Sequence, residues 1–63
     1  MITEGDRVKV IDFNGNELGK ATVINVNEFR EPELKYAIMC DFYDDDFLFV
    51  GKENLIKIKE ENK

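Results

Sequence analysis

The stretch that decides the fold lies near the start of the chain and reads Arg7-Val8-Lys9-Val10-Ile11-Asp12-Phe13-Asn14-Gly15-Asn16. Val8 and Val10 share one phase of this stretch and charged residues occupy the other, which is the alternation of a half-buried strand. Asn14-Gly15 is a strong hairpin signal, because both residue types tolerate the positive φ that tight turns require. The sequence therefore predicts a strand over residues 7–13 that pairs antiparallel with the next strand.

The second strand is predicted between Gly19 and Asn27, where β-branched residues are frequent. Its alternation is interrupted at Val23 and Ile24, which are adjacent in the sequence. Only one of these two side chains can face a core unless a β-bulge or a strong bend intervenes. A bend at this point would help to close a small barrel.

An exposed loop is predicted over residues 28–34, which contain the only proline and four charged residues. Residues 35–42 alternate again, with apolar groups in both phases, and predict a central third strand. A fourth strand over 47–50 is rich in aromatic and β-branched residues. An acidic turn separates these two strands, so we expect a second hairpin over residues 35–50.

The end of the chain predicts one 3₁₀ turn over residues 51–54, a closing strand over 55–58 and a frayed tail over 59–63. Five short strands with no helical segment longer than one turn indicate an all-β fold in a single domain. An open sheet of this size would leave one face and two edges unprotected, whereas a closed barrel buries its inward side chains. We therefore expect a five-stranded barrel.

Catalysis has little support in this composition. The chain has 63 residues, no His and no Ser, and Cys40 lies within a predicted strand. A domain this small has no room for a deep substrate cavity, and the common pairs of nucleophile and base are missing. The glycines are dispersed and form no phosphate-binding loop. We therefore predict a non-catalytic protein without a cofactor.

The net charge and the single cysteine indicate which class of partner and which cellular compartment to expect. The nine Lys and Arg residues are outnumbered by fourteen Asp and Glu residues, for a formal charge of −5. Phosphate backbones are bound through basic patches, so nucleic acid is disfavoured as a partner. The single cysteine suits a reducing compartment. No apolar run is long enough for a signal peptide or a membrane span, so we expect a cytoplasmic protein with no membrane contact.

The acidity is concentrated in one region of the chain. Residues 27–53 hold eight acids against Arg30, Lys35 and Lys52, so their net charge is −5, equal to that of the whole chain. The acids at 41 and 44–46 lack the spacing of a calcium-binding loop, so a solvated turn is favoured over a metal site. Such an acidic surface would speed the encounter with a basic partner.

Aromatic residues flank the acidic turn. Alternation places Phe47 and Phe49 on one face of the fourth strand and Leu48 and Val50 on the other. If Val50 faces the core, the two phenylalanines project outward as an exposed aromatic patch, which is typical of a protein-binding surface. The open alternative is that these rings pack against Phe29 or Leu34 of the long loop.

The order of these elements resembles the SH3-like small barrels, including the Tudor and KOW types of bacterial, phage and eukaryotic proteins. The similar segments are Gly5-Asp6-Arg7-Val8-Lys9-Val10, Leu18-Gly19-Lys20-Ala21-Thr22-Val23, Lys35-Tyr36-Ala37-Ile38-Met39-Cys40-Asp41 and Val50-Gly51-Lys52-Glu53-Asn54-Leu55-Ile56-Lys57-Ile58. The resemblance covers residues 5–58 and implies the barrel architecture. It carries no particular function, because this fold serves binders of peptides, RNA, DNA and proteins alike.

Three functions found within this group are the binding of proline-rich peptides, of nucleic acid and of methylated side chains. Each requires particular residues. The chain has no Trp for a groove that binds proline-rich peptides, and the turn after its third strand is acidic where nucleic-acid-binding KOW modules carry basic loops. A Tudor-like cage for a methylated side chain requires several converging rings. The candidates for such a cage are Phe13, Tyr36, Phe42, Tyr43, Phe47 and Phe49.

We therefore predict a protein-interaction module, a small phage or bacterial accessory protein that regulates or inhibits a larger protein with a basic surface. The contact surface would comprise residues 41–50 and 28–34, with these partner-binding residues: Asp44, Asp45, Asp46, Phe47, Phe49, Phe29 and Tyr43. One alternative is a nucleic-acid or nucleoprotein binder with a local patch of Lys9, Lys20, Lys52, Lys57 and Lys59. A homodimer formed through the exposed rings is a further alternative.

Overall fold

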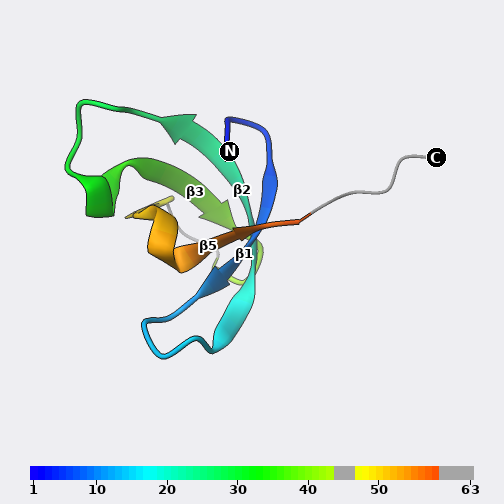
Figure 1. Ribbon diagram of the computed structural model, residues 1–63. Helices are drawn as coiled ribbons and strands as arrows, with labels where there is room; N and C mark the ends of the chain where they lie inside the picture. The colour runs from blue at the N-terminus through cyan, green and yellow to red at the C-terminus, as the bar shows by residue number, and fades with distance from the viewer. Residues whose placement is uncertain (44–46, 59–63) are drawn as a thin grey trace.

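The computed structural model describes residues 1–43 and 47–58 of the chain. The described residues form five strands and two single-turn 3₁₀ helices and contain no α-helix. The elements, in chain order, are β1 (Arg7–Ile11), β2 (Glu17–Val26), η1 (Pro32–Leu34), β3 (Tyr36–Cys40), β4 (Leu48–Val50), η2 (Lys52–Asn54) and β5 (Leu55–Lys57) (Figure 1). The predicted all-β class is confirmed, and so is the 3₁₀ turn before the last strand.

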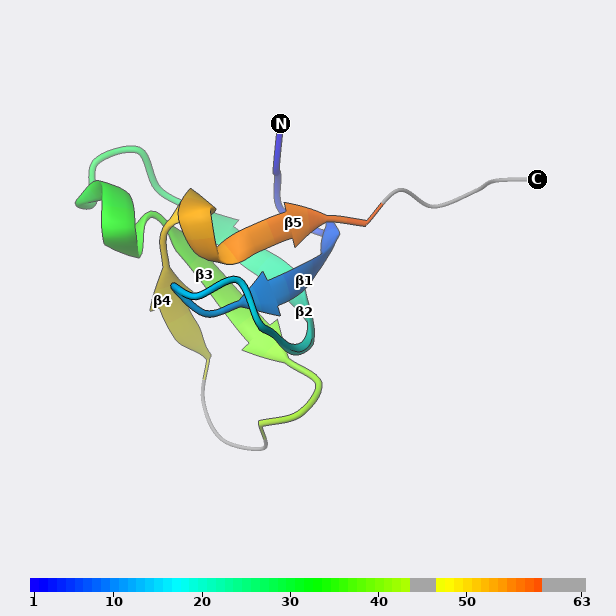
Figure 2. The ribbon, with the colours of Figure 1, turned by 60° about the horizontal axis from the view of Figure 1, so that its bottom comes forward.

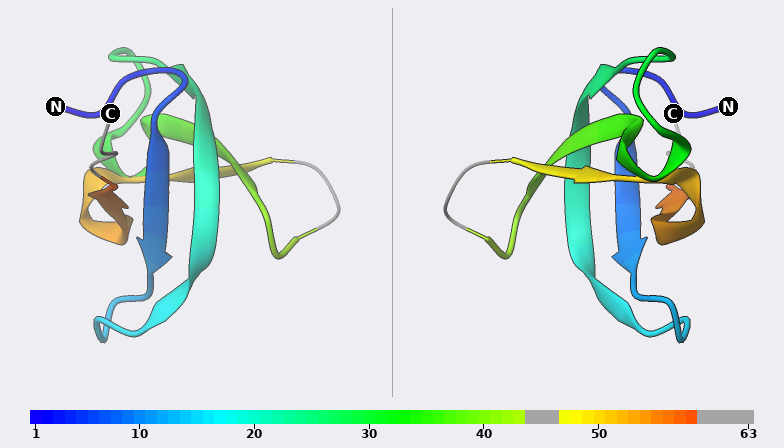
Figure 3. Two further views of the ribbon diagram at one scale, coloured as in Figure 1. Left: turned by 90° about the vertical axis from the view of Figure 1, so that its right-hand side faces the viewer. Right: turned by 90° about the vertical axis from the view of Figure 1, so that its left-hand side faces the viewer.

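All five strands belong to one antiparallel sheet with the order β4-β3-β2-β1-β5. Both predicted hairpins are present, because β1 pairs with β2 and β3 pairs with β4. Figure 3 shows how strongly the sheet curls, with β3 and β4 running across the direction of β1 and β2. The pairings of the described strands nevertheless leave β4 and β5 as two edges (Figure 2). The sheet is therefore open, and the expected closure into a barrel is not seen.

The interruption at Val23 and Ile24 is a β-bulge, one of the two irregularities that the sequence left open. Val23 pairs with Ile38 and Asn25 pairs with Ala37, so Ile24 is an extra residue on β2. Val23 is fully buried, whereas the Ile24 side chain is partly exposed. The extra residue shifts the phase of β2, so that Val26 as well as Val23 packs toward the core, and it bends β2 in its second half.

The first hairpin differs in detail from the prediction. β1 ends at Ile11 and β2 begins at Glu17, so the first strand is shorter and the second longer than expected. In this turn only Gly15 has a positive φ, of 88°. The Asp12 carboxylate accepts hydrogen bonds from the backbone N–H groups of Asn14 and Asn16, at 2.9 and 2.8 Å. These bonds close a longer loop than the two-residue Asn-Gly turn that the sequence suggests.

The predicted loop over 28–34 is partly ordered as η1, which the sequence analysis missed. Pro32 stands in its first turn, where a missing N–H costs nothing. The other boundaries shift by one or two residues, since β3 ends at Cys40, β4 begins at Leu48 and β5 ends at Lys57. The predicted tail at 59–63 lies outside the described residues.

The core lies on the inner face of the curled sheet. Its buried members share the inward phase of β1, β2, β3 and β5, and they are Val8, Val10, Ala21, Val23, Tyr36, Ile38, Cys40 and Leu55. Ile2, Val26 and Val50 pack against them and are partly buried. Phe42 shares the sequence phase of the inward residues, yet it is about half exposed because β3 ends before it. No polar or charged residue is buried among those described.

Candidate protein-interaction surface

β4 presents the two predicted aromatic anchors on its outer face. Leu48 and Val50 pair with the core residues Ile38 and Tyr36, while Phe49 pairs with Ala37 in the opposite phase. Phe47 precedes β4 by one residue, and 42% of its surface and 45% of that of Phe49 are exposed. The two rings meet edge to face, with centroids 5.6 Å apart and an interplanar angle of 82°. We call these two residues the aromatic pair.

Arg30 covers part of the aromatic pair, and the sequence analysis did not single it out. Its guanidinium carbon lies 4.8 Å from the centre of the Phe49 ring. The same side chain donates hydrogen bonds to the carbonyl oxygens of Leu34 and Lys35, at 2.6 and 3.0 Å, and to Oδ1 of Asn25 at 3.2 Å. Arg30 therefore ties the loop before β3 to the outer face of β4. The contact between Arg30 and Phe49 depends on the loop conformation, so the sequence could not predict it. The only hint in the sequence was that Arg30 follows Phe29, a predicted anchor.

Phe29, the third predicted anchor, does not join the aromatic pair. Its backbone N–H donates to Oδ1 of Asn27 at 2.9 Å, and the resulting turn leaves 97% of its surface exposed. Packing of the aromatic pair against Phe29 is thus ruled out, and the face of Phe49 is occupied by Arg30 instead. Phe29 is a separate apolar group on the adjoining loop.

The remaining predicted residues lie around the β3–β4 connection. Tyr43 is exposed and follows a turn in which its N–H donates to the Cys40 carbonyl at 3.3 Å. Phe42 lies over Gly19, where the ring occupies the space that a Cβ atom would need. Asp44, Asp45 and Asp46 lie outside the described residues, so the predicted acidic turn stays a prediction from sequence.

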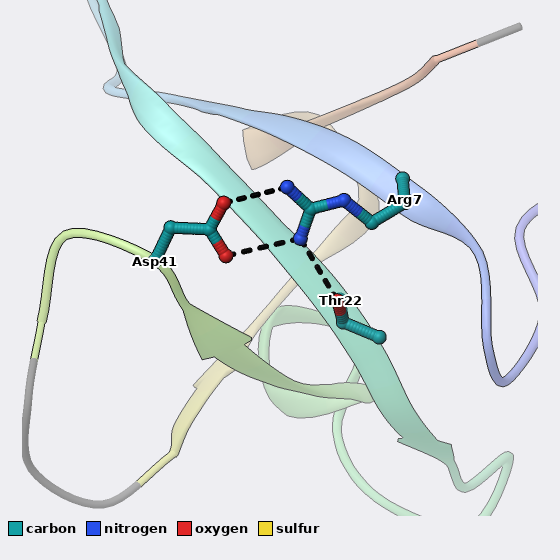
Figure 4. A network of polar contacts seen from close by, with 3 residues as sticks. All are labelled: Arg7, Thr22 and Asp41. Carbon is teal, nitrogen blue, oxygen red and sulfur yellow. Dashed lines mark hydrogen bonds and ion pairs between the residues drawn. The ribbon is translucent and has the colours of Figure 1, made fainter. Parts of the chain in front are cut away.

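Asp41 is committed to a structural ion pair with Arg7. Its two carboxylate oxygens accept hydrogen bonds from Nη1 and Nη2 of Arg7, at 3.0 and 2.5 Å, and Nη1 also donates to Oγ1 of Thr22 at 2.9 Å (Figure 4). The Arg7 hydrogen bonds lower the pKa of Asp41 below its ordinary value, and the nearby Lys20 charge acts in the same direction. This fork connects β1, β2 and the end of β3.

The lysines of the nucleic-acid alternative are distributed over several elements. Lys9 and Lys20 are cross-strand neighbours on β1 and β2. Lys57 forms an ion pair with Asp6 at 3.3 Å, and Lys52 lies beside Lys35 and Leu55 at a separate hollow. Lys59 lies outside the described residues. Only Lys9 and Lys20 are therefore seen as cross-strand neighbours.

The same part of the chain offers neither a metal-binding cluster nor an activated thiol. The described residues contain no group of three or more His, Cys, Asp or Glu side chains placed to hold a metal ion. Cys40 is a buried free thiol, and its pKa is raised by burial and, to a smaller extent, by the Asp41 charge. A raised thiol pKa opposes formation of the reactive thiolate.

A Tudor-like aromatic cage is not formed by the described rings. Tyr36 is buried in the core and Phe13 is 87% exposed. The one ring–ring contact in the described part of the chain is that of the aromatic pair, where Arg30 already lies over the Phe49 ring.

Comparison of the chain with protein-family models, with curated proteins and with solved structures finds no match. The part of the chain that the structure describes also contains no helix long and apolar enough to cross a membrane. The function is therefore inferred from the geometry of the surface.

Proposed function

We propose that this protein is a non-catalytic protein-interaction module of the SH3-like type that binds a larger protein with a basic surface. The observation that carries the proposal is the half-exposed aromatic pair, held on the outer face of β4 beneath Arg30. Rigid aromatic side chains that bury their remaining surface on contact are the usual energetic centres of protein interfaces.

Strand order supports the SH3-like assignment. Five antiparallel strands in one curled sheet, with η2 directly before β5, follow the chain order of elements on which the resemblance rests, although the sheet is open. The binding role is also consistent with charge: the chain carries −5, and residues 44–46 add three consecutive acids just before the aromatic pair in sequence. A partner with Lys and Arg around an apolar pocket would complement both features. Regulation or inhibition of that partner is the role we infer.

A capture experiment with matched variants tests this proposal. The immobilised protein is compared with Phe47→Ala and with Ile56→Ala, a control on β5 that is also about half exposed. We expect the wild type and the Ile56→Ala control to capture the same partner protein. Once that partner is purified, Phe47→Ala should bind it about tenfold more weakly or worse. Binding should also weaken as salt rises.

Three outcomes contradict the proposal. Equal binding by Phe47→Ala and wild type removes the aromatic pair as the contact. Affinity for labelled oligonucleotides that is lost steeply with salt favours the lysine alternative, and it should then depend on Lys9 and Lys20. A mass that rises with concentration in sedimentation, and is abolished by Phe47→Ala, indicates self-association through the rings.

A further inference from the structure

An open groove runs between the β1–β2 hairpin and the edge strand β4. It has a volume of about 360 Å³ and is lined by residues of β1, the hairpin, η1, β4 and η2. Val10, Ile11 and Val50 contribute the more buried part of its lining. Asn54 of η2 donates a hydrogen bond to the Ile11 carbonyl at 2.8 Å, which holds η2 against the end of β1. Two of the elements that line the groove are thus fixed to one another.

Large apolar side chains line this groove and remain exposed. Phe13 and Leu18 come from the hairpin, with 87% and 52% of their surface exposed. Leu48 and Phe49 contribute from β4 and are also partly exposed. A cluster of exposed large apolar groups around one hollow is typical of a binding site.

The charged groups that line the groove are all acidic. They are Asp12 and Glu33, and no Lys or Arg lines the hollow in the part of the chain that the structure describes. Hydrogen bonds from the backbone of Asn16 and Asn14 lower the pKa of Asp12, so its carboxylate is ionised at neutral pH and held in place. The Glu33 carboxylate forms no ion pair with, and accepts no hydrogen bond from, another described residue.

The backbone of Glu33 is also held in position, although it lies on a short element. Its Cα is within 2.9 Å of the place where a Cβ on Gly51 would lie, so η1 packs directly on the backbone before η2. The groove therefore combines apolar walls with two negative charges, of which the Asp12 carboxylate is held by hydrogen bonds and the Glu33 carboxylate extends from a fixed backbone.

We propose that this groove binds an extended segment of a partner protein in which large apolar side chains are flanked by Lys or Arg. The apolar side chains would contact Leu18, Leu48 and Phe13, and the cationic groups would approach Asp12 and Glu33. Charge complementarity selects this occupant over a second copy of the chain, which carries a net charge of −5 itself. The inference deepens the proposed function, because it states which part of a basic partner the module recognises.

Three short synthetic peptides test the groove: one alternating lysine with leucine and valine, one with glutamate in place of lysine, and one with serine in place of the apolar residues. Their binding is followed by fluorescence anisotropy and by backbone amide shifts. We expect only the cationic apolar peptide to bind, with the largest shifts at Phe13, Leu18, Leu48 and Asn54.

Two pairs of variants locate the site. Leu18→Ser and Glu33→Lys should each weaken binding of this peptide about tenfold or more. Ile56→Ser and Glu31→Lys serve as controls, since Ile56 is similarly exposed on β5 and Glu31→Lys changes the net charge by the same amount beside the groove. Both controls should bind within about twofold of the wild type.

The proposal is overturned if the three peptides bind equally or if none binds at millimolar concentration. It is also overturned if the amide shifts map outside the groove, or if Glu31→Lys weakens peptide binding as much as Glu33→Lys. Phe47 does not line the groove, so Phe47→Ala should leave peptide binding unchanged. Loss of full-length partner binding in Phe47→Ala therefore reports on the proposed function, and loss of peptide binding in Leu18→Ser reports on the groove.

Discussion

Arg7 joins three strands through one guanidinium group. It donates to both carboxylate oxygens of Asp41 and to the Thr22 hydroxyl, a geometry that lysine cannot reproduce because its ammonium group lacks a planar fork. Both partners of the ion pair keep access to solvent, so screening limits its contribution to stability. Sequence reasoning grouped Asp41 with the acids of the following turn, whereas in the structure Asp41 forms an ion pair with Arg7 of β1.

The Asp41 ion pair gives stability a dependence on acid. A carboxyl group whose pKa is lowered in the folded protein stabilises it above the ordinary pKa near 4, and this stabilisation is lost as pH falls through the lowered value. We expect urea melts to show falling stability below about pH 4. Asp41→Asn should be less stable than wild type at pH 7 and lose less on acidification.

A partial acid response should persist in Asp41→Asn, because Asp6 and Asp12 also have pKa values lowered by hydrogen bonds. Glu31→Gln is the control, since its carboxylate makes no ion pair with another described residue. If both variants keep the full acid response, the Arg7 fork does not contribute to stability.

The two 3₁₀ turns form a contact between elements that lie far apart in sequence. Gly51 precedes η2, is buried and packs on the backbone of η1 at Glu33 and Pro32. This contact connects the loop that carries Arg30 to the segment between β4 and β5. Neither turn buries a residue of its own, so their positions depend on this close approach.

Gly51→Ala should destabilise the protein and displace η1. An added Cβ would lie 2.9 Å from both Glu33 Cα and the Pro32 carbonyl oxygen, which are backbone atoms that cannot rotate away. We expect a loss of about 1–3 kcal/mol in the free energy of unfolding, measured in urea. Amide shifts should change in η1 as well as at position 51.

Lys52→Ala is the matched control, because Lys52 is the next residue and is exposed. It should change the unfolding free energy by less than about 0.5 kcal/mol. An equal effect of both variants would show that the close packing of η1 on Gly51 is not the cause.

The whole molecule depends on one small core on the inner face of a curled, open sheet. Ile38, Val8 and Val23 are its largest fully buried side chains, and each comes from a different strand among β1, β2 and β3. The outer face carries the exposed aromatic pair, and the groove lies between the β1–β2 hairpin and the edge strand β4. Apart from Val10 and Val50, which line the groove and also pack in or against the core, stability and the proposed recognition reside in different residues.

Ile38→Ala and Met39→Ala, at adjacent positions of β3, distinguish the two faces. Ile38 is fully buried and Met39 is about half exposed. We expect Ile38→Ala to cost about 2–5 kcal/mol, enough to unfold much of a domain this small. Met39→Ala should cost far less, as judged by circular dichroism during urea and thermal unfolding. Similar losses at both positions would mean that the outer face is packed as tightly as the core.

Local patterns in the sequence were sufficient for much of the fold. The alternation at Val8 and Val10 and the apolar phase of Tyr36 and Ile38 predict the strands and the central core, and the break at Val23 and Ile24 indicates an irregularity in the second strand. These features depend on the two-residue period of a strand and on burial, both of which act within a few residues. Assignment of Phe47 and Phe49 to the outer phase follows from the same period.

Contacts between distant segments decided the rest. The fork from Arg7 to Asp41, the stacking of Arg30 on Phe49 and the packing of Gly51 on η1 involve no local pattern, because the loops and the curl of the sheet bring these groups together. The same holds for the open edges at β4 and β5 and for the groove between Leu18 and Leu48. The sequence alone thus determined which segments form strands, whereas tertiary packing decided which side chains share a surface. The reason is that periodicity specifies which side chains point inward but not which outward groups meet.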